Sequence, residues 1–256
     1  MFHYTTAEGC FSIIDTSQLW ASSAFCTNDK TEIEYGLRLA KRIAKKFLPR
    51  DEYDRIAPYV SSWFSNTCVV SFSAPPADRL SHWRAYGKDG AGYAIGFRTA
   101  RLVETGEQAV PRFTLTRVIY DKKEQQKVLT GLFERERAAC SLNPAAIISR
   151  ALKLAALTFK DQGFSDESEW RLISANPFES ITRTNGKGLQ SELVTYRAAP
   201  WGIMPYIVIP FDRSLINEIW LGPGPDDRRE RTLTMFIEHH KAIIAVQRSK
   251  VPFRSL

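Results

Sequence analysis

The sequence predicts an α+β protein whose central sheets are mainly antiparallel. Two observations support this fold class: strands and helices do not alternate regularly along the chain, and the later strands follow one another over short connections. The chain of 256 residues is 44% hydrophobic and 12% aromatic, so it can bury a sizeable core. We expect a single compact domain over residues 1–256.

Short extended and helical patterns alternate in the first part of the chain. Two strands and one intervening helix are expected, at Met1–Thr5, Leu19–Ser23 and Ala7–Asp15 respectively. Within this helix, the apolar spacing predicts that Phe11 and Ile14 face the core.

Two helical insertions are expected to interrupt the sheet. In the first, at about residues 31–64, apolar residues keep helical spacing until Pro49, and a further helix is expected over Asp51–Phe64. In the second, at about residues 121–163, the turn-forming sequence SLNP separates two helices.

The remaining strands are expected in short runs that are rich in β-branched and aromatic residues. These runs are TCVVSF, YAIGF, RFTLTRVIY, EWRLIS, ELVTYRA, MPYIVIP, EIWLGP and AIIAVQRS. Two more helices are expected, at ADRLSHWRAYG and at about residues 226–241.

A formal net charge of +7 favours an anionic ligand such as a phosphate, a nucleotide or a nucleic acid. The one dense basic run, RLAKRIAKKF at Arg38–Phe47, has the spacing of a helix with a solvated basic face. No apolar stretch approaches the ~20 residues that cross a bilayer, and the first residues lack a secretory signal pattern. We therefore expect a cytoplasmic protein without a membrane partner.

Cysteines and histidines are too scattered to indicate a metal site or a disulfide framework. The four cysteines form no C-x-x-C pair, and the adjacent His239 and His240 point in different directions on a helix. The glycine pattern GAGYAIG leads into a strand rather than a helix, so it predicts a hairpin turn and not a dinucleotide-binding loop.

Three strand segments place polar side chains on one face, because side chains alternate along a strand. The polar residues are His3 with Thr5, Ser71 with Ser73, and Glu167 with Glu169 and Arg171. Two interpretations are open for them. In the first, the polar faces are solvated, and for His3 alone a capped or core histidine bonded to backbone is a further possibility. In the second, they line a common ligand cleft.

Several long motifs carry a family resemblance. FHYTTAEGCFSIIDTSQLWAS, CVVSFSAPPADRLSHWRAYGKDGAGYAIGF and ESEWRLIS occur in this order and extend over nearly the whole chain. Together they resemble the uncharacterised bacterial family known as domain of unknown function 2971. That family name implies no activity.

A second resemblance suggests an activity. The opening histidine strand, the LWAS segment and the late strand carrying glutamate are similar to ADP-ribosyltransferase folds, which have a split sandwich of antiparallel sheets. The resemblance implies that NAD is the substrate. It also implies that His3, with Thr5 beside it, holds the ribose, that Ser71 and Ser73 support the nicotinamide side, and that Glu169 is catalytic.

The chemistry explains why such residues are wanted. Breaking the nicotinamide–ribose bond develops positive charge on the sugar, and a carboxylate such as Glu169 stabilises it. Glu167 is expected to position or deprotonate an acceptor.

Arginine suits the diphosphate because its guanidinium makes paired hydrogen bonds, and Arg84 is the first candidate. Arg171 is the second, since it can instead pair with Glu169. Trp83 or Tyr86 is expected to stack on the nicotinamide ring, although a tryptophan in such a helix also suits a core.

The leading functional hypothesis is an NAD-consuming ADP-ribosyltransferase-like enzyme or NAD glycohydrolase, by analogy a toxin or a phage-defence effector. Its acceptor would be a protein or a nucleic acid. One alternative is a noncatalytic nucleic-acid or nucleotide-binding module that uses the basic helix Arg38–Phe47. Another is a metal-independent nuclease that uses His82 with Arg84.

Overall fold

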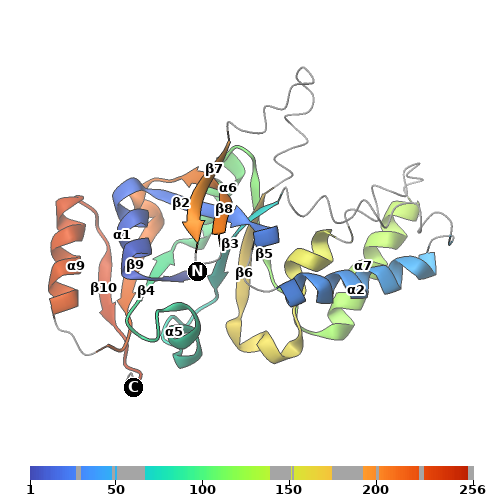
Figure 1. Ribbon diagram of the computed structural model, residues 1–256, viewed down its shortest axis with the longest axis horizontal. Helices are drawn as coiled ribbons and strands as arrows, with labels where there is room; N and C mark the ends of the chain where they lie inside the picture. Colours follow the sequence, from blue (N-terminus) through green and yellow to red (C-terminus); the bar gives the residue numbers. More distant parts are fainter. Residues whose placement is uncertain are drawn as a thin grey trace.

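The computed structural model describes residues 1–26, 30–47, 50, 67–138, 151, 153–174, 193–199, 202–224 and 228–252 (Figure 1). Its strands form a ten-stranded sheet in the order β10-β9-β4-β1-β3-β2-β8-β7, with β6 joining β3 to β5. The strands are β1 (Phe2–Thr5), β2 (Gln18–Ser23), β3 (Cys68–Ser73), β4 (Tyr93–Phe97), β5 (Phe113–Arg117), β6 (Glu169–Ser174), β7 (Val194–Ala199), β8 (Gly202–Pro210), β9 (Ile216–Leu221) and β10 (Ala245–Arg248).

The predicted mixture of helices with a mainly antiparallel sheet is confirmed. Only β9 and β10 pair in parallel among the described strand pairs. The helices are α1 (Ala7–Thr16), η1 (Ala24–Cys26), α2 (Lys30–Phe47), α5 (Leu80–Tyr86), α6 (Thr99–Gln108), α7 (Lys122–Ala138), η3 (Gln162–Glu167), η4 (Arg213–Leu215) and α9 (Arg228–His239). The sequence did not predict α6, and the helix expected at Asp51–Phe64 lies outside the described residues.

Strand β3 is the centre of the arrangement, and its two edges differ. Along one edge β6 pairs with all of Val69–Ser73. The other edge is shared: Ser73 pairs with Phe2 of β1, whereas Val69 pairs with Ser22 of β2. The sheet therefore divides beside Ser71, between β1 and β2.

Apolar residues form clusters on both faces of this sheet. One face carries the largest cluster, which includes Phe72 and Leu172 and is covered by α1, α6 and α9. The other face carries two clusters. Phe2, Tyr4 and Trp83 pack near α5, and Val69 packs with the helical insertions. Ala155, Ala156 and Leu157 of the helical segment 153–158 belong to the latter cluster.

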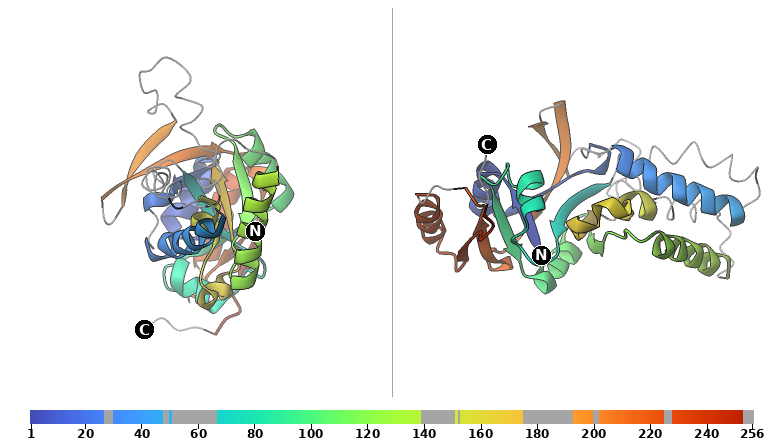
Figure 2. Two further views of the ribbon diagram at one scale, coloured as in Figure 1. Left: turned by 90° about the vertical axis from the view of Figure 1, so that its right-hand side faces the viewer. Right: turned by 90° about the horizontal axis from the view of Figure 1, so that it is seen from below.

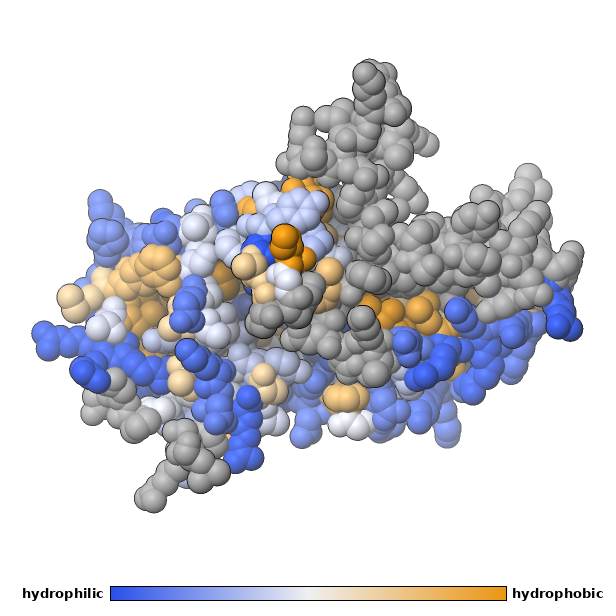
Figure 3. Space-filling view, in the orientation of Figure 1, coloured by the Kyte–Doolittle hydropathy of each residue, from blue (hydrophilic) through white to orange (hydrophobic). Residues whose placement is uncertain are grey.

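The two predicted helical insertions pack against each other. Helices α2 and α7 extend side by side away from the sheet (Figures 1 and 2), and Phe47 stacks on Phe133 at 5.2 Å between ring centroids. Leu39, Ala40 and Ile43 of α2 are buried there. Four of its basic residues are exposed, namely Arg38, Arg42, Lys45 and Lys46, and Figure 3 shows hydrophilic side chains along this part of the surface. None of the helices in the described ranges is long and apolar enough to span a bilayer.

One predicted core residue is wrong. Ile14 of α1 is buried as expected, but Phe11 is 55% exposed. Its ring stacks on Phe236 of α9 at 5.1 Å, so it lies at the outer margin of the contact between the two helices. Helical spacing alone does not show which apolar positions a distant helix leaves uncovered.

Candidate functional site

The register between β3 and β6 brings four polar residues onto one face of the sheet. Ser73 lies opposite Glu169, and Ser71 lies opposite Arg171. Residues directly opposite each other in an antiparallel pair point to the same side of the sheet. Phe2 is opposite Ser73 on the other edge, so this face continues into the cluster around Phe2 and Tyr4.

Glu169 forms a buried ion cluster with two cations. Its carboxylate accepts Arg171 Nε at 2.7 Å and Arg171 Nη2 at 3.0 Å, and it lies 2.8 Å from Lys160 Nζ. The side chains of Glu169 and Lys160 are 8% and 4% exposed. The bidentate hydrogen bonds from Arg171 and the ammonium of Lys160 together compensate the carboxylate charge of Glu169, which would be costly to bury alone.

These contacts keep Glu169 ionised. Burial acts to raise the pKa of this carboxyl, but Arg171 and Lys160 outweigh it and lower the pKa from 4.5 to about 2. A carboxylate with so low a pKa and so little exposure is a weak proton acceptor. We infer that it sets the electrostatics of the cluster rather than touching a ligand.

Glu167 connects the cluster to the surface. It ends η3, its Oε2 accepts Lys160 Nζ at 2.6 Å, and its Oε1 accepts the Tyr86 hydroxyl at 2.6 Å. The Glu167 side chain is 19% exposed, and Tyr86 is 46% exposed. Lys160 is therefore shared by both carboxylates, with Glu169 inside and Glu167 at the rim.

Four elements hold the cluster in place. Buried Gln125 of α7 donates to the Lys160 carbonyl at 2.8 Å, and the Tyr120 hydroxyl accepts the Glu169 N–H at 3.0 Å. Arg171 Nη1 donates to Leu157 O at the end of the helical segment 153–158.

Arg79 connects η3 to the start of α5 by donating to Asp166 O and to the Ser168 hydroxyl. Such supporting bonds fix the charged groups in one geometry.

His3 and Thr5 lie on the opposite face of the sheet from Glu169. Because Phe2 is opposite Ser73, His3 is beside Phe72, and their ring centroids are 5.9 Å apart. The His3 Nδ1–H donates to Ser71 O at 2.9 Å, where the sheet divides. Burial lowers the pKa of this imidazole, so the ring is neutral at pH 7.

The Thr5 side chain packs against the first turn of α1. A side chain at Gly9 would meet Thr5 Oγ1 at 2.0 Å, so the first turn of α1 lies directly against this hydroxyl. The expected cleft that joins His3 and Thr5 to the glutamates is therefore not formed, and the interpretation in which His3 bonds to backbone is the one the structure bears out.

The candidate residues on α5 fall into a buried group and an exposed group. Trp83 is 0% exposed, and its Nε1 donates to Asp78 Oδ1 at 2.8 Å, so its ring is core and cannot stack on a ligand. Arg84 lies on the exposed side of the helix, whereas Tyr86 reaches Glu167. His82, the histidine of the alternative nuclease hypothesis, is not accessible to a substrate, because it is 1% exposed and bonds to Glu167 O at 3.0 Å.

The sequence did not indicate Lys160, Tyr120 or Gln125 as site residues. Lys160 follows a helical segment with no motif around it, and only the turn through η3 returns the chain to the cluster. The local sequence could have indicated a buried charge only through the position of Lys160 directly after the apolar run ALTF. Within the described ranges, no group of three or more histidine, cysteine or acidic residues could hold a metal ion.

The comparison with known families bears on this part of the chain. Residues 82–172 match the family model described as Protein of unknown function (DUF2971). The resemblance to this family is thereby confirmed over that segment. The DUF2971 segment contains both carboxylates and both cations of the ion cluster, namely Lys160, Glu167, Glu169 and Arg171. No curated protein and no solved structure gives a significant match to the chain.

Proposed function

We propose that the protein cleaves the nicotinamide–ribose bond of NAD, either transferring ADP-ribose to an acceptor or releasing it to water. The observation that carries this proposal is the Glu167-Ser168-Glu169 pair. One carboxylate is buried and held ionised by two cations, and the other reaches the surface beside a tyrosine hydroxyl.

Burial changes the assignment of roles within the pair. Cleavage makes the ribose positive, so the stabilising carboxylate must contact the sugar. Glu167 has the exposure for such a contact, whereas Glu169 is enclosed by Lys160 and Arg171. We therefore assign the catalytic contact to Glu167 and treat Glu169 as the residue that positions Lys160.

The surroundings of Glu167 offer binding groups for the rest of NAD. The exposed ring of Tyr86 is the candidate for stacking on nicotinamide, in place of Trp83. Arg84 stays the candidate for the diphosphate because it is exposed, whereas Arg171 is buried and pairs with Glu169. Ser71 is exposed on the same sheet face as Arg171, which keeps it within this proposal as a ribose or nicotinamide contact.

The divided edge of β3 supports an ADP-ribosyltransferase-like split sheet, because β1 and β2 separate there. His3 serves this arrangement as a structural residue that bonds to Ser71 O at the division. A role as a toxin or a phage-defence effector would follow from the activity and its acceptor.

Nicotinamide release from NAD tests the proposal, measured on purified protein alone and with cell lysate as a source of acceptors. Glu107→Gln is the matched control, because Glu107 is 51% exposed, pairs with Arg112 and lies on α6, which covers the sheet face opposite Glu169. We expect release by the wild type and by Glu107→Gln, and loss of release in Glu167→Gln. An absence of release by the wild type under both conditions would refute the proposal.

A further inference from the structure

Two adjoining pockets lie on the side of the molecule formed by α6, η4 and the turn after α9. Their volumes are about 470 and about 640 Å³, within the size range of small-molecule sites. They share Arg101, Phe211, Asp212 and Ser214, so they form one continuous depression.

The larger pocket carries an excess of positive charge. Arg98, Arg101, Arg213 and Lys241 line it, and Asp212 is the only carboxylate residue among its described lining residues. Such an excess attracts an anion and aligns it by hydrogen bonds.

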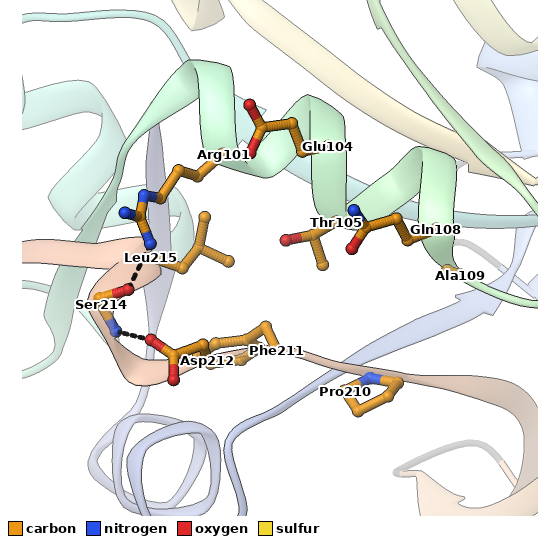
Figure 4. Close-up of a pocket in the computed structure, with 10 residues that line it drawn as sticks. All are labelled: Arg101, Glu104, Thr105, Gln108, Ala109, Pro210, Phe211, Asp212, Ser214 and Leu215. Carbon is orange, nitrogen blue, oxygen red and sulfur yellow. Dashed lines mark hydrogen bonds between the residues drawn. The ribbon is translucent and has the colours of Figure 1, made fainter.

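The arginines are fixed by neutral acceptors. Arg98 Nε donates to Ser214 O at 3.1 Å, and Arg101 Nη1 donates to Ser214 Oγ at 2.6 Å (Figure 4). Arg213 donates through Nε and Nη2 to Ile14 O and Asp15 O, both at 3.0 Å. These bonds orient the guanidinium groups without neutralising them, and each group retains further N–H donors.

The half-buried imidazole of His240 also lines this pocket. His240 has 12% side-chain exposure, and its Nε2 has no hydrogen-bond partner among the described residues, although it lies 3.5 Å from Asp15 Oδ1. This nitrogen is shielded from solvent and faces the Asp15 carboxylate, so we assign the phosphate contacts to the arginines and Lys241 and not to this ring.

The smaller pocket suits an organic group. Figure 4 shows the Thr105 hydroxyl and the Gln108 amide on α6, with Phe211 and Leu215 across from them. The Glu104 carboxylate also lines this pocket, so the phosphate group is placed in the larger one. An apolar wall facing a few hydrogen-bonding groups is typical of sites for planar or sugar-like moieties.

We propose that this depression binds a small organic phosphate of the nucleotide type. The phosphate contacts Arg98, Arg101, Arg213 and Lys241, and the organic part lies between α6 and Phe211. Leu102 of α6 and Leu215 belong to the apolar cluster that also contains Phe72, so this site lies on the opposite sheet face from Glu169. It is a second site, independent of the proposed NAD cleavage.

Calorimetric titration of the full chain with AMP, adenosine and inorganic phosphate tests the site, at about 50 and about 200 mM salt. The variant Arg98→Gln/Arg101→Gln removes two exposed cations from the pocket. Its control, Arg112→Gln/Arg231→Gln, removes two exposed cations that do not line it. Lys241→Gln is a milder second variant, and thermal melting checks that each protein is folded.

We expect AMP to bind more tightly than either fragment, and the pocket variant to weaken AMP binding by about tenfold or more. Lys241→Gln should weaken it less, and the control should leave it unchanged. The proposal is overturned if the wild type does not bind AMP, if adenosine or phosphate alone binds as tightly as AMP, or if both pocket variants bind AMP like the wild type.

Discussion

Replacing Glu169 by glutamine removes one negative charge from the buried ion cluster while nearly preserving side-chain volume. In the wild type this carboxylate accepts two hydrogen bonds from Arg171 and lies 2.8 Å from Lys160 Nζ. The variant leaves both cations buried with Glu167 alone to balance them. We expect the folded state to be strongly destabilised.

The magnitude follows from two independent considerations. Lowering the pKa of Glu169 from 4.5 to about 2 corresponds to about 3 kcal/mol, at about 1.4 kcal/mol per pKa unit. Removing one partner of a buried ion pair typically costs about 3–5 kcal/mol. A loss of about 3 kcal/mol should lower Tm by about 6–12 °C in a chain of this size.

Chemical and thermal denaturation at pH 7 measure this loss, with Glu107→Gln as the exposed control. The control removes a surface pair that contributes less than about 1 kcal/mol. The wild type should also lose this stabilisation as pH falls from 4.5 towards 2, because the unfolded carboxyl binds a proton first. Equal stabilities of Glu169→Gln and Glu107→Gln would refute the reasoning.

Three other predictions concern residues outside the ion cluster. His3→Ala should cost about 0.5–1.5 kcal/mol of unfolding free energy, because the hydrogen bond to Ser71 O is lost; denaturation curves that match the wild type would contradict this. Burial lowers the folded pKa values of His3 and His82 below 6.5. Their contribution to the free energy of unfolding should therefore be fully present above pH 6.5 and be lost as the solution becomes more acidic, and the pH dependence should be shallower in His3→Ala. Replacing Lys41, Lys45 and Lys46 by glutamine should flatten the salt dependence of any nucleic-acid binding by roughly one slope unit per lost phosphate contact, and an unchanged slope would exclude α2 as the contact.

The local structure of the strands could be predicted from the sequence. In FHYT the period of two correctly separates the buried Phe2 and Tyr4 from the half-buried His3 and Thr5. The same period correctly places Glu169 and Arg171 on one face of β6, but the expectation that Glu167 continues this strand face is wrong, because Glu167 ends η3 before the strand begins. Such patterns depend only on neighbouring residues.

Relations between strands could not be predicted in this way. Whether His3 shares a face with Ser71 depends on the register of β1 against β3, and a shift by one residue reverses the answer. Lys160 reaches the cluster only because η3 reverses the chain, and Phe11 is exposed because of where α9 packs. These outcomes are set by contacts between segments far apart in sequence.

The most direct test of the central claim compares NAD cleavage with NAD binding in Glu167→Gln. Initial rates of nicotinamide release and calorimetric NAD titration are measured on the same preparations of this variant and the wild type. We expect release to fall by about a hundredfold or more while NAD affinity stays unchanged, since the carboxylate acts on the transition state. Release by Glu167→Gln at the wild-type rate would contradict the account.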